Sequence, residues 1–285
     1  MVAKPDKPKH TASVAPSKPK VETKPVIVID PGHSGKNNDV TSKVQVDGKT
    51  YTVRDHDYPN YPEIYEMFDV SKCTAQVLRA DGYKAILTKK KALGTVTLAK
   101  RAEIANDAHA DLAISVHDDH GQGPNFEAVY DQRGVKQNGE YPVLYRDAKL
   151  GGKAVHLEIR NQKLAKASHA DAKLIAAERE KAQGHNVPFA MANIAGRAGL
   201  TGGNVWMVQD LSRVPWVYNE MGALTDGDPS KPMSLNSEQE YATGLVEGIR
   251  DAVPIAGAPD TSAHIGMLHS CLVAQQPNRP AQYRN

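Results

Sequence analysis

The run Val26-Ile27-Val28-Ile29-Asp30-Pro31-Gly32-His33 decides the fold, because four β-branched apolar residues stop abruptly at a turn that carries a histidine. The apolar residues predict a buried strand, and Pro31 with Gly32 forbids its continuation. In open α/β sheets, ligands bind in the loops at the carboxyl ends of strands. His33 is therefore a candidate ligand or catalyst, and the alternative is a plain turn with a solvated histidine.

A second strand-like run, 111–117, also ends in a histidine, His117. Two such histidines point to a metal if a carboxylate stands between them, because catalytic zinc is commonly held by two imidazoles and one carboxylate. The candidate carboxylate is Glu63, which begins the first amphipathic helix pattern, and Glu66 competes with it one turn later. Taken alone, Glu63 is better explained as an acidic residue at the positive end of a helix.

In this order, the motifs resemble those of the zinc-dependent N-acetylmuramoyl-L-alanine amidases of the amidase type 3 family, which cleave bacterial peptidoglycan. The first ligand of that family is the histidine of an Asp-Pro-Gly-His motif, here His33. The second is a glutamate that opens a helix, here Glu63, and the third is the histidine of a Ser-x-His segment, here His117. The catalytic glutamate follows a late apolar strand, here Glu220. The resemblance extends over residues 24–253.

The resemblance implies an enzyme that hydrolyses the amide bond between N-acetylmuramic acid and L-alanine, in cell-wall remodelling, cell separation or lysis. It implies Zn²⁺ as the cofactor, peptidoglycan as the substrate and an activator protein as a further partner. Zinc would lower the pKa of water, and Glu220 would pass a proton from that water to the leaving nitrogen. The implied location is the periplasm or the cell exterior, although no hydrophobic signal region is visible in the sequence.

Several residues near these motifs have open roles. Asp30 either orients His33 from behind or caps the loop. His120 is a third imidazole within reach of the site, which we expect to be solvated. His56 and Asp57 are weaker ligand candidates than His33, because they follow no predicted strand.

Two other functions compete with the amidase. Two histidines and one glutamate also serve zinc carboxypeptidases and peptidases, which here would act on the stem peptides. A carboxypeptidase needs a cation to hold the terminal carboxylate, and the candidates are Arg101 and Arg197. The third function is a catalytically inactive wall-binding regulator, which the presence of all four motif residues argues against.

The rest of the pattern predicts an α/β fold, a single domain with a mixed, mostly parallel twisted sheet and helices on both faces. A strand over 83–88, a helix over 97–108 capped by Thr97 and the strand ending at His117 alternate as parallel sheets require. The sequence predicts further strands and helices. They are a hairpin over 44–53, strands over 126–130, 141–145 and 204–209, a helix over 168–183, and a helix over 237–251 with a capping box at Ser237.

Composition limits the partners. The 285 residues carry a formal net charge of only +2, so the overall charge does not indicate binding to nucleic acid. No run approaches the ~18 apolar residues of a membrane span. Residues 1–24 are rich in Lys and Pro and predict a disordered linker before a catalytic domain over 25–254.

One segment within this domain and one after it differ from the rest. Residues 134–166 look like an insertion with weak helical spacing over 149–165, and Glu140 or Glu158 could close over the zinc as a gate. Residues 255–285 are rich in Ala, Pro and Gln and predict a loosely packed or disordered C-terminal tail. Cys73 and Cys271 are too few for a disulfide framework, and the sequence leaves open whether they pair.

Overall fold

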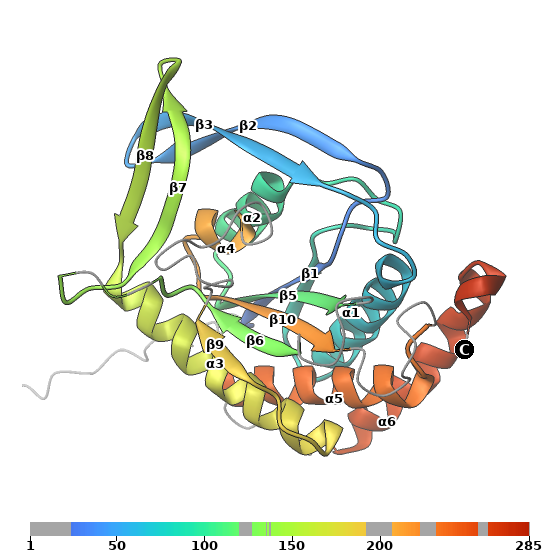
Figure 1. The fold of residues 1–285 in the computed structure, drawn as a ribbon. Coiled ribbons are helices and arrows are strands. Elements are labelled where there is room, and N and C mark those ends of the chain that lie inside the picture. Colours follow the sequence, from blue (N-terminus) through green and yellow to red (C-terminus); the bar gives the residue numbers. More distant parts are fainter. Residues whose placement is uncertain are drawn as a thin grey trace, which may run out of the picture.

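The computed structural model describes residues 24–119, 127–134, 136, 138–191, 207–222, 232–255 and 262–284. These residues form two sheets with helices packed around the larger one (Figure 1). The predicted linker lies outside the described residues except for Lys24.

The larger sheet has six strands in the order β4-β1-β5-β10-β6-β9. Its neighbours pair in parallel except β10 with β6, which are antiparallel. The predicted mixed, mostly parallel sheet is therefore confirmed. The strands are β1 Val26–Pro31, β4 Lys84–Leu87, β5 Leu112–Asp119, β6 Ala128–Asp131, β9 Phe189–Met191 and β10 Trp216–Gly222.

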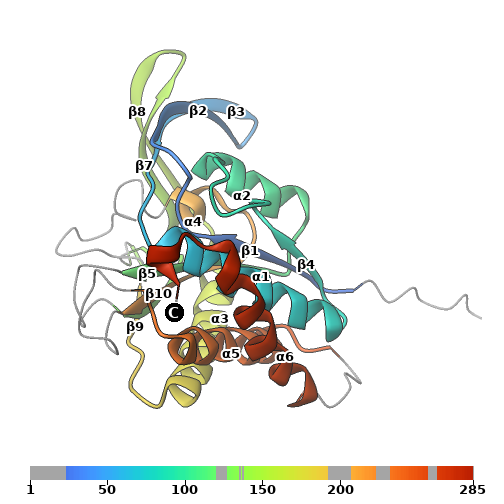
Figure 2. The ribbon, with the colours of Figure 1, turned by 90° about the vertical axis from the view of Figure 1, so that its right-hand side faces the viewer.

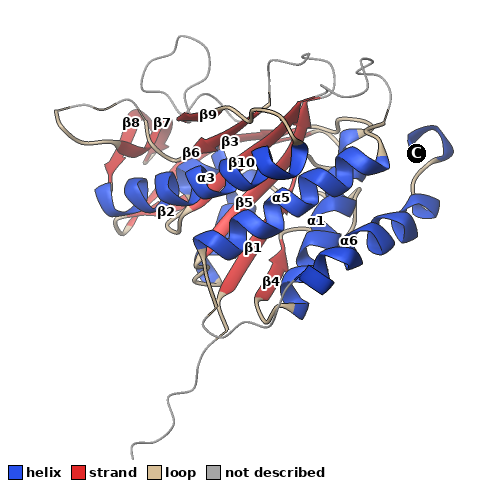
Figure 3. Ribbon diagram, turned by 90° about the horizontal axis from the view of Figure 1, so that it is seen from below, coloured by secondary structure: helices blue, strands red, loops and turns tan. Residues whose placement is uncertain are grey.

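Helices cover both faces of this sheet, as predicted. One face carries α1 Glu63–Ala80, α3 Gln162–Gln183, α5 Leu235–Ala252 and α6 Ser262–Gln275 (Figure 3). The other carries α2 Leu98–Asp107 and α4 Met207–Leu211. Because side chains alternate along a strand, Ile27 and Ile29 of β1 enter the first core while Val28 enters the second.

A smaller antiparallel sheet lies over α2 and α4, in the order β2-β3-β7-β8 (Figure 1). Its strands are β2 Asn38–Val46, β3 Lys49–Asp57, β7 Pro142–Leu150 and β8 Lys153–Arg160. The predicted hairpin over 44–53 is confirmed and is longer than expected. Its turn is Asp47-Gly48, where both residues have positive φ (47° and 73°), a conformation that suits Asp-Gly.

Several expected boundaries are wrong. The helical spacing over 149–165 is mostly strand, since β8 occupies 153–160 and α3 begins only at Gln162. The strand over 204–209 is wrong for 207–209, which open α4. The helix predicted over 237–251, α5, is capped by Ser234, whose hydroxyl accepts from the Ser237 amide, so it begins two residues before Ser237.

The expectation of a loosely packed tail is wrong for residues 262–284. Leu268 and Leu272 of α6 are fully buried against the sheet-covering helices. Cys271 on α6 forms a disulfide with Cys73 on α1, which settles the pairing that the sequence left open. Two short 3-10 turns follow, Gln276–Asn278 and Ala281–Tyr283. Of the helices in the described residues, none is long and apolar enough to cross a membrane.

Candidate metal centre

The two predicted histidines meet at the carboxyl edge of the large sheet. β1 and β5 are parallel neighbours with Pro31 opposite Val116, and the Gly32 amide donates to the Val116 carbonyl at 2.9 Å. This register brings His33 beside His117, with ring centroids 5.0 Å apart. A Cβ at Gly32 would lie 2.6 Å from Nδ1 of His117, so the approach requires glycine at that position.

Glu63, the first residue of α1, stands between the two rings. Its Oε2 lies 2.9 Å from Nε2 of His33, and its Oε1 lies 2.9 Å from Nδ1 of His117. The Asn60 side chain and the Asp118 amide also donate to this carboxylate. The competing candidate, Glu66, is buried one turn further on, where it accepts from the backbone amide of Met233.

The three side chains fit a metal ion. One donor atom from each of His33, Glu63 and His117 lies within 4.8 Å of the others. A tetrahedral zinc with bonds of about 2.0–2.2 Å needs donors roughly 3–4 Å apart, so a small closure suffices. All three side chains are nearly withdrawn from water, with at most 12% of their surface exposed. Two imidazoles and a carboxylate are also the donor set that catalytic zinc uses.

The pKa values of Glu63, His33 and His117 are shifted by burial and by their mutual charges. Burial opposes the charge on Glu63, but the facing His33 and His117 outweigh it and hold the pKa of Glu63 well below its usual range. Burial also acts against protonation of His33, yet the charge of Glu63 wins and the pKa of His33 is raised. Burial lowers the pKa of His117. The carboxylate of Glu63 is therefore ionised. A metal ion that binds here replaces the proton of His33.

The ring of His33 is oriented by the backbone of the segment after β3. Nδ1 of His33 lies 3.0 Å from the carbonyl oxygen of Tyr58. Because a carbonyl only accepts, Nδ1 carries the hydrogen of the neutral ring and Nε2 keeps its lone pair for a metal. Asp57 lies 3.8 Å from the same nitrogen. Asp57 is thus a support for the histidine and not a ligand.

Two buried basic side chains hold the loop that carries His33, and His33 has a φ of 56°, which is unusual for a residue with a side chain. Lys89 donates to the carbonyls of Gly32 and His33 at 2.6 and 2.7 Å. Arg101 donates to the carbonyls of Pro31 and His33 at 3.0 and 2.8 Å. Burial and the nearby Arg101 lower the pKa of Lys89 to about 7. No sequence signal points to Lys89, because it stands in a run of three lysines that looks like a solvated surface.

Asp30 does not orient the ring of His33. Its carboxylate accepts from Thr88, Arg101 and Ser115, so it caps the strand end, which was the alternative interpretation. Arg101 is fully buried among Asp30, Asp57 and the loop carbonyls. It therefore has no free face to hold the terminal carboxylate of a peptide, as the carboxypeptidase interpretation requires.

Glu220 lies on β10 directly beside His117 on β5, in parallel register. Tyr218, two residues earlier and so on the same face of the strand, stacks on His117 with ring centroids 4.6 Å apart and planes within 16°. Burial and the charge of Glu220 raise the pKa of Tyr218 far above its usual value, and its hydroxyl bonds to that carboxylate. Tyr218 is a second residue that the sequence analysis missed as a contributor.

The family model of the N-acetylmuramoyl-L-alanine amidases matches residues 27–251, which is most of the chain and contains all four candidate residues. The chain belongs to this amidase family. It is accordingly a peptidoglycan hydrolase that acts on the bond between N-acetylmuramic acid and L-alanine, with a His-Glu-His group able to hold a metal.

Solved structures agree with the fold of this amidase. The amidase Ami1 from Mycobacterium smegmatis aligns with a TM-score of 0.51 and 18% identity, over 80% of this chain and 96% of that one. An amidase from Clostridium difficile 630 aligns with a TM-score of 0.50 and 14% identity, over 82% of this chain and 99% of that one. Comparison with curated proteins gives no match.

The inserted segment of the amidase, residues 134–166, leaves and rejoins the large sheet away from the metal centre. β6 runs antiparallel to β10 and returns the chain to the opposite edge of the sheet, where the Trp216 amide donates to Gln132. Glu158 on β8 accepts from Arg160, and Glu140 lies 3.9 Å from that same arginine. The expectation that the ends of the insertion lie near the site is wrong, so we do not propose a gate.

Two expected features fall on residues outside the described ranges, His120 and Arg197. His56, the weaker ligand candidate, lies at the surface near Asp39, 3.9 Å from its carboxylate, and is not part of the metal centre.

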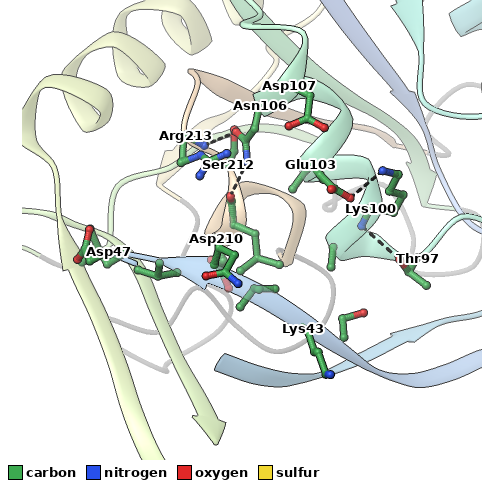
Figure 4. A pocket seen from close by; sticks show the side chains of 18 of the residues that line it. Lys43, Asp47, Thr97, Lys100, Glu103, Asn106, Asp107, Asp210, Ser212 and Arg213 are labelled. Atoms are coloured by element: carbon green, nitrogen blue, oxygen red, sulfur yellow. Dashed lines mark hydrogen bonds and ion pairs between the residues drawn. The ribbon is translucent and has the colours of Figure 1, made fainter. Parts of the chain in front are cut away.

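The amidase also has a cleft of about 780 Å³ under the smaller sheet, between β2, α2 and the residues after α4 (Figure 4). One charge pair lies in it, Lys100 with Glu103 at 2.8 Å, and the backbone amide of Arg213 donates to the side-chain oxygen of Asn106 at 2.6 Å. Among the described residues that line it, none is a metal or catalytic candidate. This cleft is therefore separate from the metal centre.

Proposed function

We propose that the amidase uses one zinc ion, held by His33, Glu63 and His117, with Glu220 as the group that moves the proton. The observation that carries this proposal is the convergence of three donor atoms within 4.8 Å at the carboxyl edge of the sheet, beside Glu220. The family match supports it, because all four residues lie within the matched segment.

A zinc ion held by His33, Glu63 and His117 would supply a water of lowered pKa and would polarise the scissile carbonyl. Glu220 accepts the proton of the attacking water and delivers it to the nitrogen of L-alanine as the amide bond breaks. The hydroxyl of Tyr218 donates to Glu220 and fixes its orientation, while its ring packs on His117. Tyr218 is thus a positioning residue for both groups.

We also propose that the enzyme acts outside the cytoplasm, in the periplasm or at the cell wall. Its substrate lies there, and the disulfide between Cys73 and Cys271 is of a kind that persists in oxidising compartments. Peptidoglycan is its principal partner, and an activator protein stays a prediction.

The roles of the two glutamates are separated by substitution. Glu220→Gln keeps the shape of the side chain and removes its basicity, so zinc should remain at about one per chain while turnover falls ~100-fold or more. Glu63→Ala should instead lose zinc. Metal analysis and turnover on peptidoglycan measure both. Glu180→Gln, an exposed glutamate on α3, is the matched control and should change neither. Near-normal turnover of Glu220→Gln would show that Glu220 is not the base.

A further inference from the structure

Three tyrosines cluster at the beginning of α1, around the candidate ligand Glu63. Tyr61 precedes that glutamate by two residues and Tyr65 follows it by two, with ring centroids 6.0 Å apart. The third ring comes from the C-terminus: Tyr283 lies parallel to Tyr61 within 5°, with centroids 6.0 Å apart, and 5.7 Å from Tyr65. Figure 2 shows the C-terminal turns, in red, beside α1. We call these three residues the tyrosine platform.

The C-terminal ring is held firmly in place. Arg279 donates to Glu238 at 2.6 and 2.9 Å and to Asp69 at 2.7 Å, which ties the last turns to α5 and α1. The disulfide between Cys73 and Cys271 fixes the preceding helix to α1. This segment lies beyond residues 27–251 matched by the family model, so the platform includes a contribution from outside that match.

Exposed apolar side chains lie on, or pack against, the segments that carry the metal ligands. Of the six large apolar side chains that the described residues expose, Tyr61 and Tyr58 are exposed by 42% and 47% on the segment that leads to Glu63. A third, Leu93, is 44% exposed, and its carbonyl packs against Gly35 in the loop after His33. Single exposed apolar residues need no explanation, whereas two exposed tyrosines within five residues of a metal ligand are candidates for a binding surface.

We propose that the tyrosine platform binds a sugar ring of the glycan strand while the amide bond is cleaved. The inference rests on the proposed function, because the scissile amide joins the lactyl group of a sugar to a peptide, which places the glycan next to Glu63. A phenol ring offers a flat apolar face to the C–H face of a sugar and a hydroxyl at its edge for hydrogen bonds. The three phenols are uncharged, which matches the glycan better than the stem peptide with its carboxylates.

Binding of peptide-free glycan tests this inference without any hydrolysis. Uncharged oligosaccharides of N-acetylglucosamine, which have the β-linked sugar backbone of the glycan strand and no lactyl carboxylate, are titrated calorimetrically into the zinc-loaded full chain. Tyr283→Ala should weaken binding roughly three- to tenfold, the usual worth of one aromatic contact. Tyr283→Phe should retain most of the affinity, because the face of the ring remains. Leu174→Ala, which removes a 38% exposed apolar side chain on α3, is the control and should bind as the wild type does.

A second readout separates substrate binding from a structural role. On intact peptidoglycan, Tyr283→Ala should raise KM with little change in kcat, since the ring contacts substrate and transition state alike. Its zinc content should not change. Unchanged glycan affinity would overturn the inference, and so would a loss of zinc, which would make Tyr283 a support for Glu63. Weaker binding of free stem peptides instead of glycan would also overturn it. A chain that binds glycan through Tyr283 but cleaves no amide would overturn the proposed function alone.

Discussion

At the scale of single residues, His33 depends on neighbours that are distant in the sequence. Its positive φ costs of order 1–2 kcal/mol for a residue with a side chain. Lys89 and Arg101 offset that cost by donating to the carbonyls around it, and the Tyr58 carbonyl fixes its ring. The histidine thus faces Glu63 in one tautomer and one orientation.

Zinc affinity should depend on pH through His33. A metal binds only the neutral imidazole, and the charge of Glu63 holds the pKa of His33 above its ordinary 6.5. Affinity should therefore fall as pH drops through that raised pKa, by up to about tenfold per pH unit, and the fall should begin above pH 6.5. The pKa of His117 is lowered, so protonation of His117 weakens zinc binding only at lower pH.

Competition with a chelating dye between pH 5.5 and 8.5 measures this dependence. His56→Gln removes an imidazole outside the metal centre and should leave the curve unchanged. A zinc affinity that is flat between pH 8 and 6 would mean that His33 carries no proton in the metal-free protein.

How much of the site could be predicted is clear at this same scale. His33 and His117 each follow a predicted strand, so the strand pattern places them at one edge of a sheet, whereas the roles of Glu63 and Glu220 were predicted through the family resemblance. Lys89 and Tyr218 do not carry such a signal, because their roles come from burial beside groups that other strands supply. The tertiary fold, and not the local pattern, converts them from ordinary surface and strand residues into supports.

At the scale of elements, the C-terminal helix α6 is the largest departure from expectation. Its apolar residues Leu268 and Leu272 pack on the helices of the first core, but it follows a segment rich in Ala and Pro that suggested disorder. Its docking depends on pairings across most of the chain, such as Cys73 with Cys271, 198 residues apart. No local signal reports a contact of that range.

The disulfide should contribute measurably to stability. A cross-link over so long a loop restricts the unfolded chain, so replacing both cysteines by serine should lower the free energy of unfolding by about 2–5 kcal/mol. Chemical denaturation of the double variant beside wild type, with and without reductant, measures the effect. Reductant should lower the free energy of unfolding of the wild type only. The zinc content should stay the same, because neither cysteine lies at the metal centre. If the oxidised wild type and the double variant had equal free energies of unfolding, the disulfide would not stabilise the fold.

At the scale of the whole molecule, the candidate site residues lie at one edge of the large sheet, while the added four-stranded sheet lies over the helices on one of its faces. The carboxyl ends of β1 and β5, the end of β10 and the beginning of α1 meet at that edge, and the C-terminal turns add Tyr283 beside them. The smaller sheet stands over α2 and α4 instead (Figure 1). The sequence predicted the large sheet through its alternation of strands and helices. It did not predict the four-stranded sheet, whose pairing of β3 with β7 joins segments nearly a hundred residues apart.

The most direct test of the central claim is the identity of the bond that is cut. Purified peptidoglycan is digested with the zinc-loaded wild type and, in parallel, with Glu220→Gln, and the products are identified by mass spectrometry. We expect free stem peptides with a new L-alanine amino terminus and intact glycan strands from the wild type, and almost none from the variant. Stems that are only shortened, with no new L-alanine terminus, would contradict the account.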